Sequence, residues 1–273
     1  MLDGMKIAFV GGGVMCEAII KSLMRAALTT PDRICVAEPV ETRRAKLAED
    51  YQVRVTPDNG EAVQEAQIVL LSVKPQVMNA VLRGLHGSAA PDALVISIAA
   101  GVPIRRISDG LGSGQPIVRV MPNTPAQIGE GMSAWTCTAS VTEAQRDQAR
   151  AILRCMGKEQ FVADEHFLDM ATALSGTGPA YVFLFMEAMI DVGVHLGFSR
   201  AMSESLVMQT VKGSVDYAIQ SGQHVAQLRN QVTSPGGTTA EALYILEEGG
   251  LRTVLARAVW AAYERSVALG KGE

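Results

Sequence analysis

Two segments in the second half of the chain combine glycines with side-chain hydroxyls. The first runs from Ser234 to Thr239 with the sequence SPGGTT. Its two glycines allow backbone amides to converge, and the helix expected over 239–248 directs its positive N-terminus toward the same place, as in sites that bind small anions. A helix start with an ordinary glycine turn would show the same residues and stays open as an alternative. We expect a carboxylate to bind there through Ser234, Gly236, Gly237 and Thr238.

The second segment, Ser175-Gly176-Thr177-Gly178-Pro179, precedes a long apolar stretch. Pro179 suits the first turn of a helix. The hydroxyls of Ser175 and Thr177 are candidates for substrate contact. Close packing between helices would explain the glycines equally well, so both interpretations stay open.

A glycine turn lies near the start of the chain, between the strand-like run Lys6–Val10 and an amphipathic helical pattern. In this context Gly11 permits the tight turn, and Gly13 lets a pyrophosphate approach the amides at the helix N-terminus. Cys16, a small residue, stands where the third glycine of this motif usually lies. A turn that merely connects strand to helix is the simpler alternative. The turn predicts a dinucleotide site with contacts from Gly11, Gly13, Val14 and Met15.

Glu38 ends the second strand-like run. An acidic side chain at this place accepts hydrogen bonds from the ribose hydroxyls and repels a 2′-phosphate, so Glu38 favours NADH over NADPH. Arg43 and Arg44 follow in the next helix and could reach a 2′-phosphate, which keeps NADPH open. We expect these two arginines to lie on a solvated helix face instead.

The ends of later strands supply further candidates, because ligands of open α/β sheets bind at the carboxyl ends of the strands. Lys74-Pro75 follows one such strand, and Ala99-Ala100-Gly101 and Met121-Pro122-Asn123 end two more. We therefore expect the cofactor to lie against Val73, Lys74, Pro75, Ala99, Ala100, Met121 and Asn123.

The elements that must position these residues fall into two halves. Up to about residue 163, helical patterns alternate with strand-like runs at Lys6–Val10, Arg33–Ala37, Ile68–Val73, Leu94–Ile98 and Ile117–Met121. Nearly continuous apolar strands are typical of a parallel sheet covered by helices on both faces. Thr142 and Gln145 form the capping-box pattern of a helix that reaches Met156. The first half of this α/β chain, 1–164, is therefore predicted to be a doubly wound Rossmann domain.

From residue 165 to 273 the strand-like runs disappear, and helical patterns cover roughly 165–174, 178–196, 200–221, 225–232, 239–248 and 251–269. Tyr181–Leu196 is apolar almost all round, which predicts deep burial against its own chain and a second subunit. Glu187 and Asp191 interrupt it, which argues against a membrane span. We expect these two to pair with basic or hydroxyl groups rather than form an acid/base dyad. The second half is predicted to be an all-helical substrate-binding and dimerisation domain.

The composition narrows the class of protein. The 273 residues are 48% hydrophobic and 19% charged with a net charge of −4, which suits a globular chain and gives no basic block for nucleic acid. The four cysteines form no C-x-x-C pair and the four histidines show no ligand spacing, so we expect no metal site and no disulfide framework. No secretory signal pattern precedes the first strand. A reduced cytoplasmic protein is the resulting expectation.

Several segments resemble one family, and the resemblance extends over essentially the whole chain. They are Gly11–Ile19, Val73-Lys74-Pro75-Gln76, Arg119–Pro125 (RVMPNTP), Leu174–Tyr181 (LSGTGPAY) and Ser234–Glu241 (SPGGTTAE). Together they are similar to pyrroline-5-carboxylate reductase, and SPGGTT is the most specific of them. The resemblance implies NAD(P)H-dependent reduction in the last step of proline synthesis, a helical domain interleaved into a homodimer, and in many members a ring of dimers.

The resemblance also implies roles for single residues. Thr239 matches the family threonine whose hydroxyl lies near the imine nitrogen, where it would hydrogen-bond or relay a proton, and Asn59 matches a family cofactor contact. Because the implied cyclic imine can bind as a protonated iminium, positioning can supply much of the rate without a histidine-type acid. Thr177 stands where many members have Ser, Val225 where Pro is common, and Glu38 departs from the family's usual NADPH preference.

Other functions stay open at this stage. A β-hydroxyacid dehydrogenase shares the first domain's pattern and a helical second domain, but its usual catalytic lysine helix is not evident here. A non-enzymatic nucleotide sensor would need only the dinucleotide turn, whereas this chain carries two further glycine–hydroxyl segments. A related imine with a six-membered ring is an alternative substrate.

Overall fold

The computed structural model describes all residues except 1, 3, 113, 272 and 273. The chain divides into two compact units, Met1–Thr177 together with Ala262–Glu273, and Gly178–Ala261. Contacts thus group residues 165–177 with the first unit, although the sequence pattern changes at residue 164. Each unit is described by itself below.

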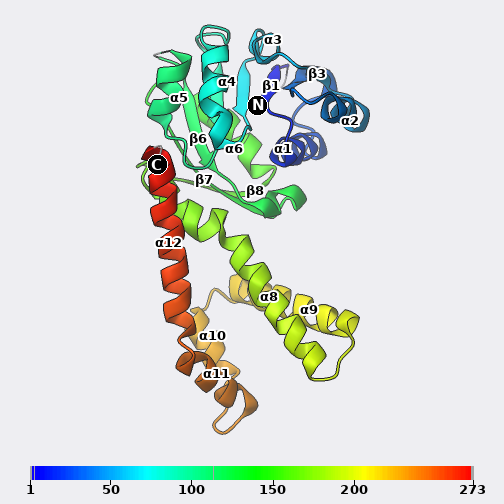
Figure 1. Ribbon diagram of the computed structural model, residues 1–273, viewed down its shortest axis with the longest axis vertical. Coiled ribbons are helices and arrows are strands. Elements are labelled where there is room, and N and C mark those ends of the chain that lie inside the picture. The colour runs from blue at the N-terminus through cyan, green and yellow to red at the C-terminus, as the bar shows by residue number, and fades with distance from the viewer. Residues whose placement is uncertain (1, 3, 113, 272–273) are drawn as a thin grey trace. The chain divides into compact units, whose positions relative to one another are not determined.

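The first unit is built on an eight-stranded sheet in the order β3-β2-β1-β4-β5-β6-β7-β8 (Figure 1). Its strands are β1 Ile7–Val10, β2 Ile34–Ala37, β3 Arg54–Thr56, β4 Ile68–Leu71, β5 Leu94–Ser97, β6 Ile117–Met121, β7 Gly131–Cys137 and β8 Gly157–Phe161. Neighbouring strands are parallel except β6 and β7. The chain turns back from β3 to pair β4 with β1, so the strand order reverses beside β1, where doubly wound folds bind ligands.

Five of these strands, β1, β2, β4, β5 and β6, confirm the strand-like runs of the sequence, and the α/β doubly wound architecture is confirmed with them. The sequence missed β3, β7 and β8. The three-residue β3 and the edge strand β8 lack a continuous apolar run, since β8 has the sequence GKEQF with alternating burial. Charged side chains on edge strands hinder pairing with other chains, and they also hide such strands from a search for apolar runs.

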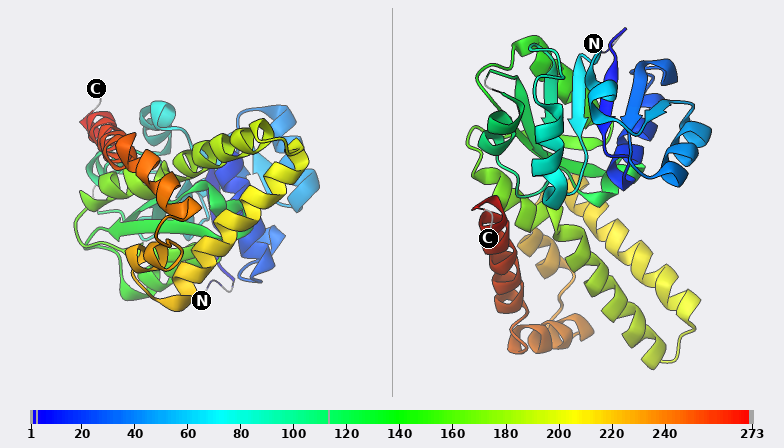
Figure 2. Two further views of the ribbon diagram at one scale, coloured as in Figure 1. Left: turned by 90° about the horizontal axis from the view of Figure 1, so that it is seen from below. Right: turned by 45° about the horizontal axis from the view of Figure 1, so that its top comes forward.

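Helices cover both faces of the sheet (Figure 2). The helices of this unit are α1 Val14–Arg25, α2 Glu41–Tyr51, α3 Asn59–Val63, α4 Met78–Leu85, α5 Ile104–Leu111, α6 Glu143–Arg154 and α7 Phe167–Ala171. One core cluster takes residues from α1, α2 and α6, and the other from α3, α4 and α5. The predicted stripe of α1 is buried at Cys16, Ile19, Ile20 and Leu23, each such apolar side chain contributing about 1.5–3 kcal/mol.

Short segments complete the first unit. Three 3₁₀ helices cover Pro31–Arg33, Pro75–Val77 and Thr124–Ile128, and a π-helical segment covers Thr172–Gly176 directly after α7. The predicted capping box is present at the start of α6, where the Thr142 hydroxyl accepts a hydrogen bond from the Gln145 amide and the Gln145 side chain accepts one from the Thr142 amide.

The second unit consists of helices, as predicted: α8 Gly178–His195, α9 Arg200–Ser221, α10 Val225–Gln231, α11 Thr238–Glu248 and the first part of α12. Helix α12 (Leu251–Lys271) is continuous, and its residues from Ala262 onward belong to the first unit. Helices α8 and α9 pack closely, because a Cβ at Gly193 would lie 2.6 Å from the Ser203 hydroxyl oxygen. Caps at Ser199 and His224 begin α9 and α10.

Apolar side chains remain exposed along α8 within this single chain. Phe183 and Leu184 are 61% and 66% exposed, and Ile190 is the buried residue of the helix. The chain itself therefore does not supply the deep burial that the sequence predicts for Tyr181–Leu196, and a contiguous apolar surface of this kind marks an interaction site. The run Phe167–His195 has the length and composition of a membrane-spanning helix, a test that the core helix of a soluble protein also passes.

Candidate active site

The glycine turn after β1 is fixed by backbone geometry and by its neighbours. Gly11 has a φ of 98°, its amide donates to the Ala37 carbonyl at 2.8 Å, and its carbonyl accepts from the Ser72 hydroxyl at 2.7 Å. A Cβ on Gly11 would lie 2.8 Å from Val73 Cγ1 and 3.0 Å from the Ser72 carbonyl oxygen. The left-handed backbone and the close approach both require glycine here.

Gly13 is placed differently, as the N-cap of α1. Its φ of −73° suits any residue, and a Cβ there would meet nothing within 4 Å. Val14, the first residue of the helix, is 61% exposed, and Met15 is partly buried behind it. The space over these amides is thus open, which is the arrangement that a phosphate at a helix N-terminus requires.

Glu38, directly after β2, is held against the glycine turn. Its carboxylate accepts hydrogen bonds from the amides of Gly12 and Val40 at 2.9 and 3.0 Å. A Cβ on Gly12 would lie 2.6 Å from Leu47 Cδ1, so the turn packs closely on α2. Each carboxylate oxygen keeps a further acceptor position, and Glu38 can still accept from hydroxyls of a bound ribose.

Arg43 and Arg44 do not form the solvated helix face that the sequence predicts. Arg43 Nε donates to the Gly12 carbonyl at 2.7 Å, and its guanidinium pairs with Glu17. Arg44 donates to the carbonyls of Glu38 and Pro39 at 2.7 and 2.8 Å. Both arginines satisfy backbone carbonyls around the turn, which the amphipathic pattern of one helix cannot reveal.

Cys16 takes the place of the motif's third glycine and is fully buried in α1. Burial raises the pKa of its thiol far above the ordinary value, so the group stays neutral and acts as a small apolar side chain. The residue therefore preserves close packing of the helix on the sheet.

The remaining cofactor candidates lie at the same edge of the sheet. Asn59 begins α3 after β3, and Lys74 is the N-cap of the 3₁₀ helix Pro75–Val77 after β4. The buried Ala99 and its neighbour Ala100 follow β5, and Met121 ends β6. Because these strands are parallel neighbours, their carboxyl ends share one edge with the glycine turn.

Asn123 links this edge to the second glycine–hydroxyl segment, Ser175–Pro179. Its side-chain amide donates to the carbonyl and the hydroxyl of Ser175, both at 3.3 Å, and its carbonyl oxygen accepts from the Met132 amide at 2.8 Å. A Cβ on Gly176 would collide with the terminal carbon of Met121. The structure thus places the predicted substrate residue Ser175 beside two predicted cofactor residues.

Ser175 lies in the π-helical segment, and Thr177 follows it. The amide and hydroxyl of Thr177 both donate to the Thr172 carbonyl, at 2.8 and 2.9 Å. The Thr177 hydroxyl oxygen can still accept a hydrogen bond. Single π-helical turns are frequent at functional sites.

The first glycine–hydroxyl segment, Ser234–Thr239, lies in the second unit and leads into α11. Gly236 has a φ of 67°, and the Gly237 amide donates to the Ser234 carbonyl at 3.0 Å, which closes a tight turn. Gly237 is the N-cap of α11, so Thr238 and Thr239 form its first turn, one residue earlier than predicted. The amides of a first helical turn have no partner within the helix, which leaves them for a bound anion.

Several other polar side chains have partners within the fold. The His166 ring contacts the Tyr263 hydroxyl at 3.1 Å, His224 accepts from the Ala226 amide at 3.2 Å, and Asp191 pairs with Arg200 at 2.9 Å. Among the described residues no group of three His, Cys, Asp or Glu side chains could hold a metal ion.

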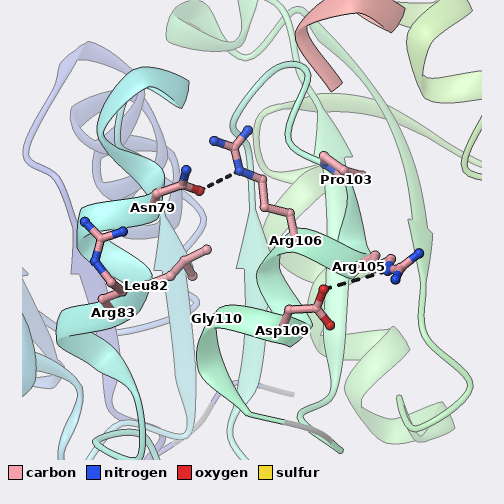
Figure 3. A pocket seen from close by; sticks show the side chains of 8 residues that line it. All are labelled: Asn79, Leu82, Arg83, Pro103, Arg105, Arg106, Asp109 and Gly110. Atoms are coloured by element: carbon pink, nitrogen blue, oxygen red, sulfur yellow. Dashed lines mark hydrogen bonds and ion pairs between the residues drawn. The ribbon is translucent and has the colours of Figure 1, made fainter. Parts of the chain in front are cut away.

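A surface groove of about 400 Å³ lies between α4 and α5. Figure 3 shows that Arg106 reaches Asn79 across it, at 2.6 Å, while Arg105 pairs with Asp109 of its own helix at 3.7 Å. None of its lining residues is a predicted site residue; they are Asn79, Leu82, Arg83, Pro103, Arg105, Arg106, Asp109 and Gly110.

Arg119 of β6 is the residue that sequence reasoning missed. It appeared only as a letter of the RVMPNTP segment, yet its side chain is buried and pairs with Glu165 at 2.7 Å. A charged residue within an otherwise apolar central strand was the available signal, because a buried guanidinium requires partners.

Comparison with known proteins gives matches over both halves. Residues 165–269 match the family model for pyrroline-5-carboxylate reductase dimerisation, and residues 6–101 match that of NADP oxidoreductase, coenzyme F420-dependent. The pyrroline-5-carboxylate reductase of Synechocystis is 44% identical to this chain over 97% of it and 98% of the relative. That of Pseudomonas aeruginosa is 41% identical over 97% of this chain and 97% of the relative.

Solved structures agree with these matches. Plasmodium falciparum pyrroline carboxylate reductase with NADP bound aligns with a TM-score of 0.91 at 34% identity, covering 99% of this chain and 100% of that one. The pyrroline-5-carboxylate reductase of Coxiella burnetii aligns with a TM-score of 0.88 at 37% identity, covering 98% and 99%. The chain therefore belongs to the pyrroline-5-carboxylate reductase family.

Proposed function

We propose that this protein reduces 1-pyrroline-5-carboxylate to L-proline with a reduced nicotinamide coenzyme, the last step of proline biosynthesis. The observation that carries the proposal is 44% identity to a pyrroline-5-carboxylate reductase over 97% of the chain. The dinucleotide turn and both glycine–hydroxyl segments lie within the matched length. A dehydrogenase of hydroxyacids or a nucleotide sensor does not require this combination.

The residues at the carboxyl edge of the sheet fit a dinucleotide. The open space at Gly13 leaves room for a pyrophosphate, whereas Gly11 and Gly12 are closed by their neighbours. Val14, Met15, Asn59, Val73, Lys74, Pro75, Ala99, Ala100, Met121 and Asn123 would complete the binding surface. When bound, the reduced nicotinamide supplies the hydride.

NADH is the coenzyme that Glu38 favours. Its carboxylate is fixed beside the turn by two backbone amides, where a 2′-phosphate would meet a like charge. Arg43 and Arg44 are engaged with carbonyls and with Glu17, which makes them poor partners for that phosphate.

The substrate carboxylate is assigned to the turn that begins α11. Ser234, Gly236, Gly237 and Thr238 would surround it with amides and hydroxyls, and the positive end of α11 would stabilise its charge. The Thr239 hydroxyl would hydrogen-bond the imine nitrogen or relay its proton. Ser175, in the π-helical segment, and Thr177, directly after it, are the candidate substrate contacts of the first unit. The chemistry then needs orientation and exclusion of water more than a strong acid.

A dimer formed through the helical unit accounts for the exposed apolar side chains. Phe183, Leu184 and Phe185 are each at least half exposed, and burial of these side chains between two copies would remove them from water. Glu187 and Asp191 on the same helix would be costly in lipid, which favours a protein partner over a membrane. A ring of dimers in the cytoplasm is the corresponding assembly.

Substrate comparison tests this function. Purified protein is given 1-pyrroline-5-carboxylate or its six-membered-ring analogue, each with NADH and with NADPH, and coenzyme oxidation is followed by absorbance. We expect the highest kcat/KM with the five-membered imine. Faster reduction of the six-membered imine would reassign the substrate, and coenzyme binding without oxidation would identify a sensor.

A further inference from the structure

Arg119 of β6 is buried in the first unit and has no role in the proposed chemistry. The Arg119 side chain is 5% exposed; its Nη1 lies 2.7 Å from Glu165 Oε1 and its Nη2 lies 3.6 Å from Asp169 Oδ1. The same Glu165 oxygen accepts a hydrogen bond from the Ile104 amide at 2.7 Å. A buried guanidinium that lost these partners would be strongly unfavourable, so the ion pairs fix Glu165 and Asp169 in place.

Arg119 belongs to a row of three contacts along β6 and its extension. Side chains at alternate positions of a strand lie on one face, and positions 119, 121 and 123 follow this spacing. Arg119 reaches Glu165 and Asp169, Met121 packs on Gly176, and Asn123 donates to Ser175. The row therefore contacts the chain from Glu165, two residues before α7, to Gly176, the last residue of the π-helical segment.

The end of the chain contacts the same helix from another side. The buried Ser266 hydroxyl donates to Asp169 Oδ1 at 2.8 Å, so Asp169 is shared between Arg119 and α12. Three residues later, Leu269 packs on Gly101 after β5, where a Cβ would lie 2.9 Å from Leu269 Cβ. Arg119 is thus the cation of a network that joins β6, α7, α12 and the end of β5.

We infer that Arg119 is a positioning residue for the imine reduction: its ion pairs to Glu165 and Asp169 hold α7 and the π-helical segment, and thereby keep Ser175 and Thr177 in place beside Met121 and Asn123. The inference rests on the proposed function of that segment. Arg119 does not act on the reacting atoms, because its guanidinium is paired with Glu165, which precedes α7, and with Asp169 of α7. Its effect is exerted through the geometry of the substrate segment.

Substitution of Arg119 separates this role from general stability. Arg119→Met removes the charge, and Arg119→Lys keeps it but loses the planar fork that spans two carboxylates. Arg150→Met is the matched control, because Arg150 also pairs with two carboxylates, Asp147 at 3.0 Å and Glu143 at 3.4 Å, on α6. Active sites are counted by coenzyme titration, so that unfolded protein does not enter the rates.

We expect Arg119→Met to retain the coenzyme Kd within about twofold and to lose about 10- to 100-fold in kcat/KM for the imine, as small misplacements of a substrate contact do. Arg119→Lys should recover part of this loss, and Arg150→Met should match the wild type. Equal kcat/KM in Arg119→Met and wild type, or a parallel loss of coenzyme binding, would overturn the inference.

Two further measurements keep the inference testable. If Arg119→Met does not fold, Glu165→Gln removes one charge while keeping the hydrogen bonds, and we expect a smaller loss of kcat/KM with an unchanged coenzyme Kd. Amide hydrogen exchange over 172–177 should speed up in the Arg119 or Glu165 variant and not in Arg150→Met; unchanged exchange refutes the positioning role. Absence of imine reduction in the wild type would refute the proposed function instead, and exchange would still decide the role of Arg119.

Discussion

Replacement of Gly11 by alanine and replacement of Gly13 by alanine are predicted to impair the protein for different reasons. Gly11 has a left-handed backbone and no room for a Cβ, whereas Gly13 has an ordinary backbone and an open surround. Gly11→Ala should therefore damage the fold, and Gly13→Ala should damage coenzyme binding while leaving the fold intact.

The magnitudes follow from the geometry. A left-handed alanine costs about 1–2 kcal/mol and forcing extra volume into a packed site costs about 1–3 kcal/mol, so Gly11→Ala should lower the free energy of unfolding by about 2–5 kcal/mol. For Gly13→Ala, the reduced entropy of the unfolded chain stabilises by about 0.4–1 kcal/mol, and the poorer N-cap offsets a similar amount. The net change in stability should stay within about 1 kcal/mol.

Denaturant unfolding and coenzyme titration measure the two effects separately. We expect Gly13→Ala to weaken the coenzyme Kd by at least about tenfold, since a methyl group would occupy the space over the helix amides and a factor of ten is only about 1.4 kcal/mol. If Gly13→Ala binds coenzyme as the wild type does, the pyrophosphate does not approach the chain at this residue, and the assigned position of the dinucleotide is wrong.

Four further results are expected. Glu38→Ser should shift the ratio of kcat/KM with NADPH to kcat/KM with NADH at least about tenfold toward NADPH by removing the like charge. Substitution of the exposed Glu41 by serine should leave this ratio unchanged. An unchanged ratio in Glu38→Ser would show that Glu38 does not determine coenzyme choice. Thr239→Ala should lower kcat about 10- to 100-fold with Thr239→Ser near wild type, and full turnover of the alanine variant at saturating imine would remove Thr239 from the reaction. Leu184→Glu should yield monomers in light scattering, and a dimer that persists would move the interface elsewhere. Because burial raises the pKa of Cys16, only the unfolded thiol ionises above about pH 8.5, so the free energy of unfolding falls there by up to about 1.4 kcal/mol per pH unit. Cys16→Ala should flatten this decline in unfolding measured from about pH 8 to about pH 10. An equal slope in the variant and the wild type would show that the Cys16 thiol ionises in the folded protein.

The fold was predictable where a strand is both buried and apolar along its whole length. A strand such as Ile68–Leu71, which is buried at every residue, has a continuous run of apolar residues that can be recognised in the sequence. Strand β8 was not predictable, because it pairs at the edge of the sheet and alternates exposed Lys158 with partly buried neighbours. The long helices of the second unit were predictable, since their length exceeds any plausible strand.

The candidate site was predictable where a local motif carries it. The glycine turn needs only its flanking strand and helix, and SPGGTT needs only the helix that follows. The roles of Arg43 and Arg119 depend on partners 31 and 46 residues away, Gly12 and Glu165. Such pairings are set by the tertiary fold, and the sequence around each arginine does not identify its partner.

Hydride transfer to the imine carbon is the central claim, and an isotope label tests it most directly. The protein is incubated with 1-pyrroline-5-carboxylate and coenzyme that carries deuterium at the transferable position of the reduced nicotinamide, and the products are examined by mass spectrometry and NMR. The account predicts L-proline with one deuterium at Cδ for each coenzyme oxidised. Coenzyme oxidation without labelled proline, or binding of both ligands without oxidation, would contradict it.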